Sequence, residues 1–463
     1  MRLAQNAGQN DMDLRTTLLL AGCRDDVARM LARLFRCRKG ATAITFGAMA
    51  TVLVGFAGVA VEGGSWYVTK RAAQTAADTA AQAAAVAVAF NRPAAAAAQE
   101  TSARNGFTDG ANNTVVTVNH PPAAGPNAGD ATAVEVRVRR TTPLQIAALF
   151  MGGNAVIETR AVARSLIMGG GSACILALGQ AGGSLVQEVD LSLGGNASVT
   201  AAACSLASNT SIKQFGNSKI TAFTLAAVGS VQIGNPNNVT LERPPSSYQP
   251  PIQDPFAPGV PGTGIPLPAQ SGACSHTNYS VKPNQTRNLA PGRYCGCMDL
   301  KGTAVLSPGV YVIQNGSLTA NAQATITCPT CTPGNGVTFV FTGEANQIGG
   351  PKINGGATID LMGGTADYPG ILMYQDPRAP AGNSIKLNGG ANITTRGLFY
   401  FPSADLTING NFGGNNTTCK AFIGESITLT GTTEQTVVVD GCEALGLDPD
   451  TALPQIRVVR LVE

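Results

Sequence analysis

The sequence predicts a membrane-anchored α+β protein with a long N-terminal transmembrane helix, a small α+β stalk and then a right-handed parallel β-helix, or β-solenoid. Three observations carry this prediction. Ala41 to Val61 is a run of twenty-one residues without a charge. An alanine-rich stretch follows it to residue 90. From Cys174 onward, short β-rich runs are separated by Gly and Asn, and several of these runs resemble one another.

The composition fits a folded chain that carries a membrane segment. Of the 463 residues, 44% are hydrophobic and only 13% are charged. The 55 glycines, 27 prolines and 5% aromatic residues favour many turns and narrow packing over a helical bundle. The net charge is +3, and no basic face is interleaved with aromatic residues, so we expect no nucleic acid partner.

The uncharged run 41–61 has the length that an α-helix needs to cross a hydrocarbon core of about 30 Å. Basic residues close to a span stay in the cytoplasm, so residues 1–40 are predicted to form a cytoplasmic N-terminal segment and the rest of the chain to be exported. A cleaved signal peptide is the alternative, but the basic segment is long, the apolar run exceeds a typical signal, and no clear cleavage site follows. The basic residues close to the run are Arg24, Arg29, Arg33, Arg36, Arg38 and Lys39.

Residues 62–171 are predicted to form the stalk. The alanine-rich stretch has high helix propensity and continues the transmembrane helix until Pro93 ends it. A second helix is expected after Pro93. Hydrophobic alternation and a short apolar run then predict two strands, a short helix and another strand, at 114–120, 132–140, 143–151 and 154–167.

The β-rich region contains a repeated phrase: an alternating strand, a Gly or Gly-Asn corner and a second short strand. Gly389, Gly410 and Gly431 are 21 residues apart, which is the spacing of stacked coils. One coil cannot bury its inward face alone, so neighbouring coils share an apolar core along an axis. The phrase recurs at 190–200, 211–221, 351–360 and 384–394. The expected inward residues are Ile353, Ile359, Ile385, Leu387, Ile393, Leu406, Ile408, Ile427 and Leu429.

A proline-rich segment at residues 244–269 interrupts the repeated β-rich runs. Such a segment is extended and PPII-like, so it is either a linker or a strap laid on the solenoid. It divides the solenoid into a first part at 172–243 and a main part at 270–450. A C-terminal strand or tail, 451–463, completes the predicted organisation.

Eleven cysteines are present, and the nine that follow the span lie in a compartment that permits disulfides. Four thiolates could instead hold a structural zinc ion, but the chain has only two histidines and the compartment is oxidising, so we favour disulfides and expect no metal site. Because nine is odd, at least one of these thiols is free or pairs between chains. The candidate pairs are Cys174 with Cys204, Cys274 with Cys295 or Cys297, Cys419 with Cys442, and Cys328 with Cys331 or with one of Cys295 and Cys297.

The segment from Arg38 to residue 85 resembles the N-terminal part of TadG-like Flp pilus-assembly proteins, which belong to the tight-adherence (Tad) machinery of the bacterial envelope. The exported region also resembles the β-helical C-terminal halves of some family members, at 173–179, 190–200, 254–257, 308–313 and 370–378. The matching positions are Gly40 before the span, Tyr67 after it, and Gln74 with Asp78 in the alanine-rich helix. The resemblance implies a pilin-like stalk and a non-enzymatic component of the bacterial inner membrane whose C-terminal region is periplasmic. It also implies other Tad/Flp envelope components or pilins as partners, with cell wall or glycan as a further contact.

Two departures from the family pattern matter. Pilin subunits of this system carry Glu at the fifth mature position, whereas Thr45 stands there in this chain, which argues against release by a prepilin peptidase. Some relatives end in a von Willebrand A-type domain with an Asp-x-Ser-x-Ser metal site. The nearest match begins at Asp190 and lacks the last Ser, so the resemblance implies no metal ion.

A catalytic site is not predicted, and neither is a cofactor. Parallel β-helices also host polysaccharide lyases and hydrolases, but no two acids recur at a spacing that would form a carboxylate pair for acid/base work. Asp376 and Arg378 flank a proline in a turn that could contact a partner. A carbohydrate-binding adhesin or a polysaccharide-active β-helix is therefore the alternative function.

Two helix faces are candidate contact surfaces. Lys70, Gln74 and Asp78 are four residues apart and share one face, which is either ordinary surface pairing or a contact face for envelope subunits. In the span, the small residues Gly47, Thr51 and Gly55 would let another helix approach, although such stripes are common.

Overall fold

The structure is a computed structural model, and it describes residues 41–89, 92–149, 152–179, 188–390, 392–410, 412, 418–448 and 453–463. The predicted cytoplasmic segment 1–40, including Gly40, lies outside the described residues. Two compact units are present. Among the described residues, the first comprises 41–84, 93–163 and 461–463, and the second comprises 85–89, 92 and 164–460 with the gaps given above.

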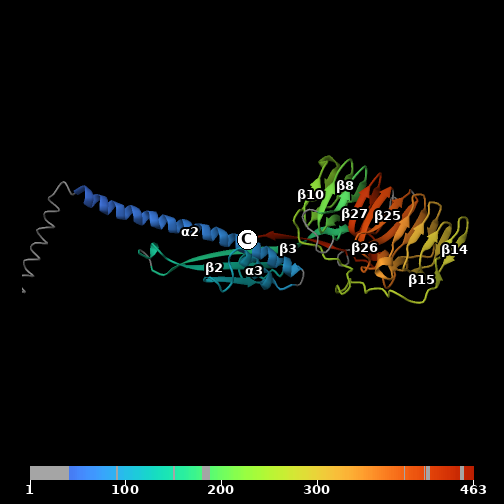
Figure 1. The fold of residues 1–463 in the computed structure, drawn as a ribbon, viewed down its shortest axis with the longest axis horizontal. Coiled ribbons are helices and arrows are strands. Elements are labelled where there is room, and N and C mark those ends of the chain that lie inside the picture. Colours follow the sequence, from blue (N-terminus) through green and yellow to red (C-terminus); the bar gives the residue numbers. More distant parts are fainter. Residues whose placement is uncertain are drawn as a thin grey trace, which may run out of the picture. The chain divides into compact units, whose positions relative to one another are not determined.

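The first unit is built on one helix, α2 (Ala41–Ala89), which runs without a break through the predicted span and the alanine-rich stretch (Figure 1). It is the one helix in the described part of the chain that is long and apolar enough to cross a membrane. Its apolar side chains are exposed in the first half, as at Phe46 and Phe56, whereas alanines such as Ala76 and Ala80 are buried in the second half. The two halves therefore face different surroundings.

The rest of the first unit follows the predicted order closely. Helix α3 (Ala94–Arg104) begins directly after Pro93, whose fixed φ suits the start of a helix. Strands β1 (Thr114–Asn119) and β2 (Ala133–Pro143) pair antiparallel, with Val116 opposite Val138. The predicted short helix is a single 3₁₀ turn, η1 (Ala147–Leu149), and β3 (Asn154–Ala177) extends ten residues beyond the predicted strand.

The second unit is a large β-rich region in which strands pair in parallel with strands three further along the chain. Because the same step recurs, the strands form three ladders. The first contains β12 (His276–Thr277), β15 (Gly292–Cys295), β18 (Gly309–Gln314), β21 (Val337–Thr342), β24 (Ile371–Gln375) and β26 (Ile393–Gly410). The second contains β13 (Ser280–Val281), β16 (Met298–Leu300), β19 (Leu318–Ala320), β22 (Pro351–Ile353) and β25 (Asn383–Gly389). The third contains β14 (Thr286–Leu289), β17 (Thr303–Leu306), β20 (Thr325–Thr327) and β23 (Thr358–Met362). The long strand β26 also pairs with β25 and β23, so it continues all three ladders.

The order of strands in the ladders differs from their order in the chain. Strand β26 pairs with β27 (Lys420–Thr430), and β27 pairs in turn with β3 and with β4 (Val189–Leu193). The first part, 172–243, therefore continues the ladders where the main part, 270–450, ends. It adds β6 (Ser205–Ser208), β7 (Ser211–Gln214), β9 (Leu225–Ala227) and β10 (Val231–Ile233). A smaller parallel sheet contains β28 (Glu434–Thr436), β5 (Ser198–Ala201), β8 (Lys219–Ala222) and β11 (Val239–Leu241).

Three 3₁₀ turns and one C-terminal strand complete the second unit. They are η2 (Pro236–Asn238), η3 (Ala345–Gln347), η4 (Glu443–Leu445) and β29 (Gln455–Leu461). The backbone N–H of Ala173 in β3 donates to the Pro454 carbonyl at 2.8 Å, just before β29 begins.

The predicted 21-residue spacing corresponds to one coil, since Gly389 is opposite Gly410. Other repeated phrases that are 34 residues apart are also direct neighbours, in one longer coil. Ile353 is opposite Leu387 and Ile359 is opposite Ile393, so the phrase at 351–360 pairs with the phrase at 384–394. The amide of Asn409 donates to that of Asn388 at 3.2 Å, at the corner beside Gly410. All nine predicted inward residues are at most 3% exposed. The coarser fold prediction is confirmed: a long apolar N-terminal helix precedes a large β-rich region.

The proline-rich segment contacts strands from both parts of the β region. The side chain of Asn209 and the backbone of Ile252 exchange two hydrogen bonds, of 2.9 and 2.7 Å. The hydroxyl of Tyr400 donates to the Asp254 carboxylate at 2.7 Å, and the ring of Phe256 meets that of Tyr400 edge-on. Burial raises the pKa of Asp254, although the hydrogen bond from Tyr400 opposes this.

Candidate functional site

The candidate site is the helix α2 together with the residues of the first unit that hold it. Gln74 donates to Asp78 at 2.7 Å and to the backbone carbonyl of Arg160 at 3.1 Å. This face of the helix is therefore partly used within the stalk. Tyr67 is 62% exposed and Lys70 is also exposed. Of the predicted positions, Tyr67 and Lys70 remain available to a partner, whereas Gln74 positions α2 against β3.

Glu62 directly follows the uncharged run and is only 9% exposed. Its two carboxylate oxygens accept hydrogen bonds from the backbone N–H groups of Gln145 and Ala147, both at 2.8 Å. The carboxylate thus satisfies two donors of the segment that connects β2 to β3. No motif in the sequence predicts this role of Glu62, and the one local sign of it is an acidic residue at the end of an apolar run.

A second carboxylate, that of Glu135 in β2, is fully buried and accepts hydrogen bonds from several donors. Arg160 and Arg137 form ion pairs with it, and the amide of Asn119 and the N–H of Ala123 donate to it. Burial acts to raise the pKa of Glu135, but the hydrogen bonds from Arg160, Asn119 and the others outweigh burial and lower the pKa to about 2. Arg160 also pairs with the side chain of Glu463, so the C-terminal residue of the chain completes this cluster.

Eight of the nine candidate cysteines lie at disulfide distance from a partner. The Cα–Cα distances are 5.9 Å for Cys174 and Cys204, 5.7 Å for Cys274 and Cys295, 5.4 Å for Cys328 and Cys331, and 4.6 Å for Cys419 and Cys442. These are all among the predicted pairs.

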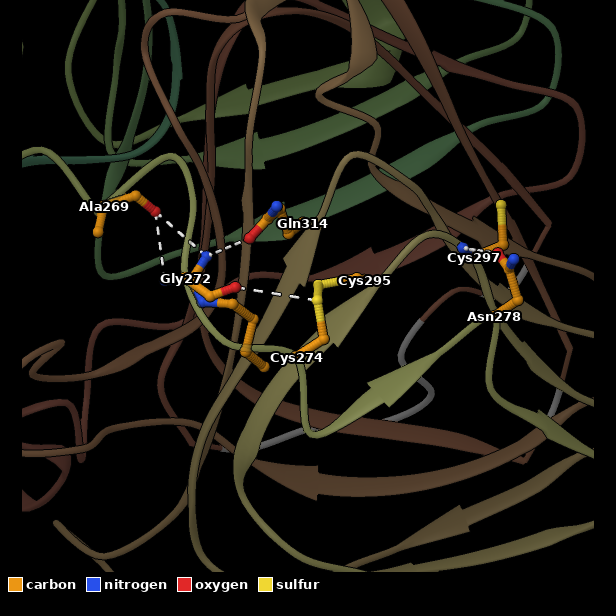
Figure 2. Close-up of a disulfide and its surroundings, with 8 residues drawn as sticks. Ala269, Gly272, Cys274, Asn278, Cys295, Cys297 and Gln314 are labelled. Carbon is orange, nitrogen blue, oxygen red and sulfur yellow. Dashed lines mark hydrogen bonds between the residues drawn. A yellow bond between two sulfur atoms is a disulfide. The ribbon is translucent and has the colours of Figure 1, made fainter.

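The ninth cysteine, Cys297, is exposed and unpaired. Figure 2 shows it two residues after the Cys274–Cys295 bridge, where its backbone N–H donates to the Asn278 side chain at 3.3 Å. Among the described residues, no group of three or more His, Cys, Asp and Glu side chains is arranged to hold a metal ion.

The turn at Asp376 and Arg378, the candidate partner contact, is engaged inside the β region. The Asp376 side chain is fully buried and accepts a hydrogen bond from Thr342 at 2.7 Å. Arg378 forms an ion pair with Asp376 at 2.6 Å and also donates to the Pro268 carbonyl. The pair therefore holds the end of the proline-rich segment in place. The Asp376 carboxylate is buried and so is not accessible to a glycan.

Lys420 at the start of β27 is the one fully buried lysine among the described residues. Its ammonium group donates to the Phe412 carbonyl at 2.8 Å and to the Gln435 side chain at 3.0 Å, and it lies between the rings of Phe412 and Phe422. Burial lowers the pKa of Lys420 to about 7. Its partners are internal, so we assign it a structural role.

Comparison with known proteins identifies the N-terminal helix. Residues 40–87 match the family model described as Flp pilus-assembly TadE/G-like, which confirms the resemblance to TadG-like proteins and coincides with the apolar helix α2. No curated protein and no solved structure matches the chain. The membrane-proximal helix therefore carries the one functional assignment that a comparison supplies.

Proposed function

We propose that the chain is a non-enzymatic, inner-membrane-anchored component of Flp/Tad pilus assembly, which exposes a periplasmic β-solenoid as a scaffold or tether. The observation that carries this proposal is the TadE/G-like match at 40–87, which falls on a helix able to cross a membrane. Its partners would be other Tad/Flp envelope components or pilins.

The orientation rests on charge. Six basic residues between Arg24 and Lys39 precede the uncharged run, and basic flanks remain cytoplasmic. With the N-terminus inside, the β region lies in the periplasm, where disulfides persist. The four cysteine pairs at disulfide distance support that location.

The solenoid interpretation rests on the parallel ladders. Strands recur at a step of three, like residues stack on like residues, and one apolar core runs through both parts of the region. Stacked coils of this kind would offer their side surfaces to partners. Because the Asp376–Arg378 pair is used internally, we prefer a scaffold to a carbohydrate-binding or polysaccharide-active β-helix.

A strain that lacks the chain tests the role. We expect it to lose surface pili while it still produces pilin, because assembly rather than pilin synthesis would be blocked. Supplying the full-length chain from a plasmid is expected to restore the pili, which electron microscopy and immunoblots of sheared fractions measure. A strain that lacks the chain but carries a normal number of pili would exclude the proposed role.

A further inference from the structure

The segment 144–149, here called the apolar loop, is held to α2 at the point where the uncharged run ends. The Glu62 carboxylate accepts hydrogen bonds from the backbone N–H groups of Gln145 and Ala147, each at 2.8 Å. These two donors need no water, because a charged acceptor satisfies both. The loop can therefore enter a medium of low polarity without leaving these backbone groups unpaired.

The loop also lies beside the last residues of the uncharged run. The side chain of Ile146 packs against Gly58 so closely that a Cβ on Gly58 would overlap it. Gly58 lies three residues before Val61, which corresponds to about 4.5 Å along the helix axis. If α2 crosses the bilayer with the run 41–61 in the hydrocarbon core, Ile146 lies at the depth of that core.

The surface around the contact is apolar. Leu149 is 80% exposed and Ile146 is 38% exposed, although both carry large aliphatic side chains. Ala147 of the same loop lines a hollow of about 540 Å³, whose lining is almost entirely apolar. It is formed by Thr51, Val52, Gly55, Phe56, Val59, Trp66 and Ala147. An exposed apolar surface of this kind, continuous with the exposed side chains of a membrane-crossing helix, is suited to lipid.

We propose that the apolar loop is a second membrane anchor, which inserts into the interface of the leaflet from which α2 emerges and places acyl chains in the hollow. Glu62 positions the loop rather than contacting lipid. Two linked anchors would fix the depth and rotation of α2, and thereby the stalk, relative to the bilayer surface. This inference rests on α2 crossing the membrane and goes beyond a role in pilus assembly.

Tryptophan fluorescence tests the proposal, because Trp66 is the one tryptophan of the chain. The full-length protein is reconstituted in vesicles whose acyl chains carry bromine, a contact quencher. Leu149→Trp is made in a chain that also carries Trp66→Phe. We expect the introduced tryptophan to emit at a shorter wavelength than a tryptophan exposed to water. We also expect the bromolipid to quench it as strongly as it quenches Trp66 in the unaltered chain. Val115→Trp in the same background is the matched control. Val115 is a 53% exposed apolar residue of β1, and a tryptophan placed there should be quenched by aqueous acrylamide instead.

The positioning role of Glu62 is tested by adding Glu62→Gln to the chain that carries Leu149→Trp and Trp66→Phe. This change keeps the size of the side chain but removes the charge that holds the two N–H groups. The bromolipid quenching of the introduced tryptophan should therefore fall, while α2 remains inserted.

Three outcomes would overturn part or all of the proposal. Acrylamide access to the tryptophan introduced at position 149, with normal bromolipid quenching of Trp66 in the unaltered chain, would overturn the loop proposal alone. Loss of bromolipid quenching at Trp66 itself would overturn the membrane span as well. If the introduced tryptophan is protected from acrylamide only after another membrane protein is added, the surface binds a protein partner, and the lipid proposal is overturned.

Discussion

Arg160→Met is expected to lower the free energy of unfolding of the first unit by about 2–3 kcal/mol, because it removes one of the two guanidinium groups that pair with the buried carboxylate of Glu135 and leaves only Arg137. The substitution also removes the partner of Glu463, so the C-terminal residue loses its ion pair. Chemical denaturation of the detergent-solubilised full-length protein, with disulfides intact, measures the loss. Residue 160 keeps its aliphatic packing in this variant.

The matched control is Arg104→Met, which removes an exposed ion pair on α3. Arg104 and Glu100 are 76% and 65% exposed, so this pair is expected to contribute no more than about 1 kcal/mol. If the two substitutions lower the free energy of unfolding equally, burial of Glu135 does not increase the contribution of its ion pair to stability.

The loss at Arg160 should depend on pH with a definite sign. The pKa of Glu135 is about 2 in the folded protein, below its ordinary value, so its stabilising contribution is complete above about pH 4.5 and disappears as the pH falls toward 2. Without Arg160, that pKa should rise. The difference in unfolding free energy between the unaltered protein and Arg160→Met should therefore be smaller at about pH 3 than at about pH 7. A difference that is the same at both pH values would contradict the assigned pairing.

Gly316→Ala is expected to destabilise the β region by about 3 kcal/mol or more, because an added Cβ would overlap the backbone carbonyl of Gly296 on the neighbouring strand connection. The obstacle is backbone held by the parallel ladders on both sides, which cannot give way as a flexible side chain could. The shift of the denaturation midpoint measures the effect.

Gly355→Ala is the matched control, since Gly355 is exposed and the nearest atom to its added Cβ is a carbonyl oxygen at 3.4 Å, an ordinary contact. A tolerated Gly316→Ala would mean that neighbouring turns do not approach as closely as the ladders require.

The sequence predicted those features that depend on local pattern. Hydrophobic run length located the long apolar helix, Pro93 located the start of α3, and the 21-residue glycine spacing placed Gly389 opposite Gly410. The 34 residues between Gly355 and Gly389 form one longer coil, not the two shorter coils that the spacing suggested. These features follow from periodicity and backbone geometry, which are encoded within short segments.

The features that could not be predicted depend on partners distant in the chain. Arg160 and Glu463 are 303 residues apart, and Glu62 meets Gln145 from a separation of 83 residues. The pairing of β27 with β3 reverses the order expected from the chain, because a parallel ladder can be continued by any strand of matching face. Buried Lys420 likewise carried no local signal, since its acceptors are brought to it by the fold.

The most direct test of the central claim removes the β region while keeping the anchor and stalk. Ala173 donates to Pro454, and Val162 exchanges hydrogen bonds with the C-terminal residues, so joining residue 175 to residue 453 through a short Gly-Ser linker preserves these contacts. Pili are counted in a strain that produces this shortened chain in place of the full one. We expect the shortened chain to reach the membrane but the surface pili to be lost. Normal piliation and adherence with the shortened chain would contradict the claim that the β region serves pilus assembly.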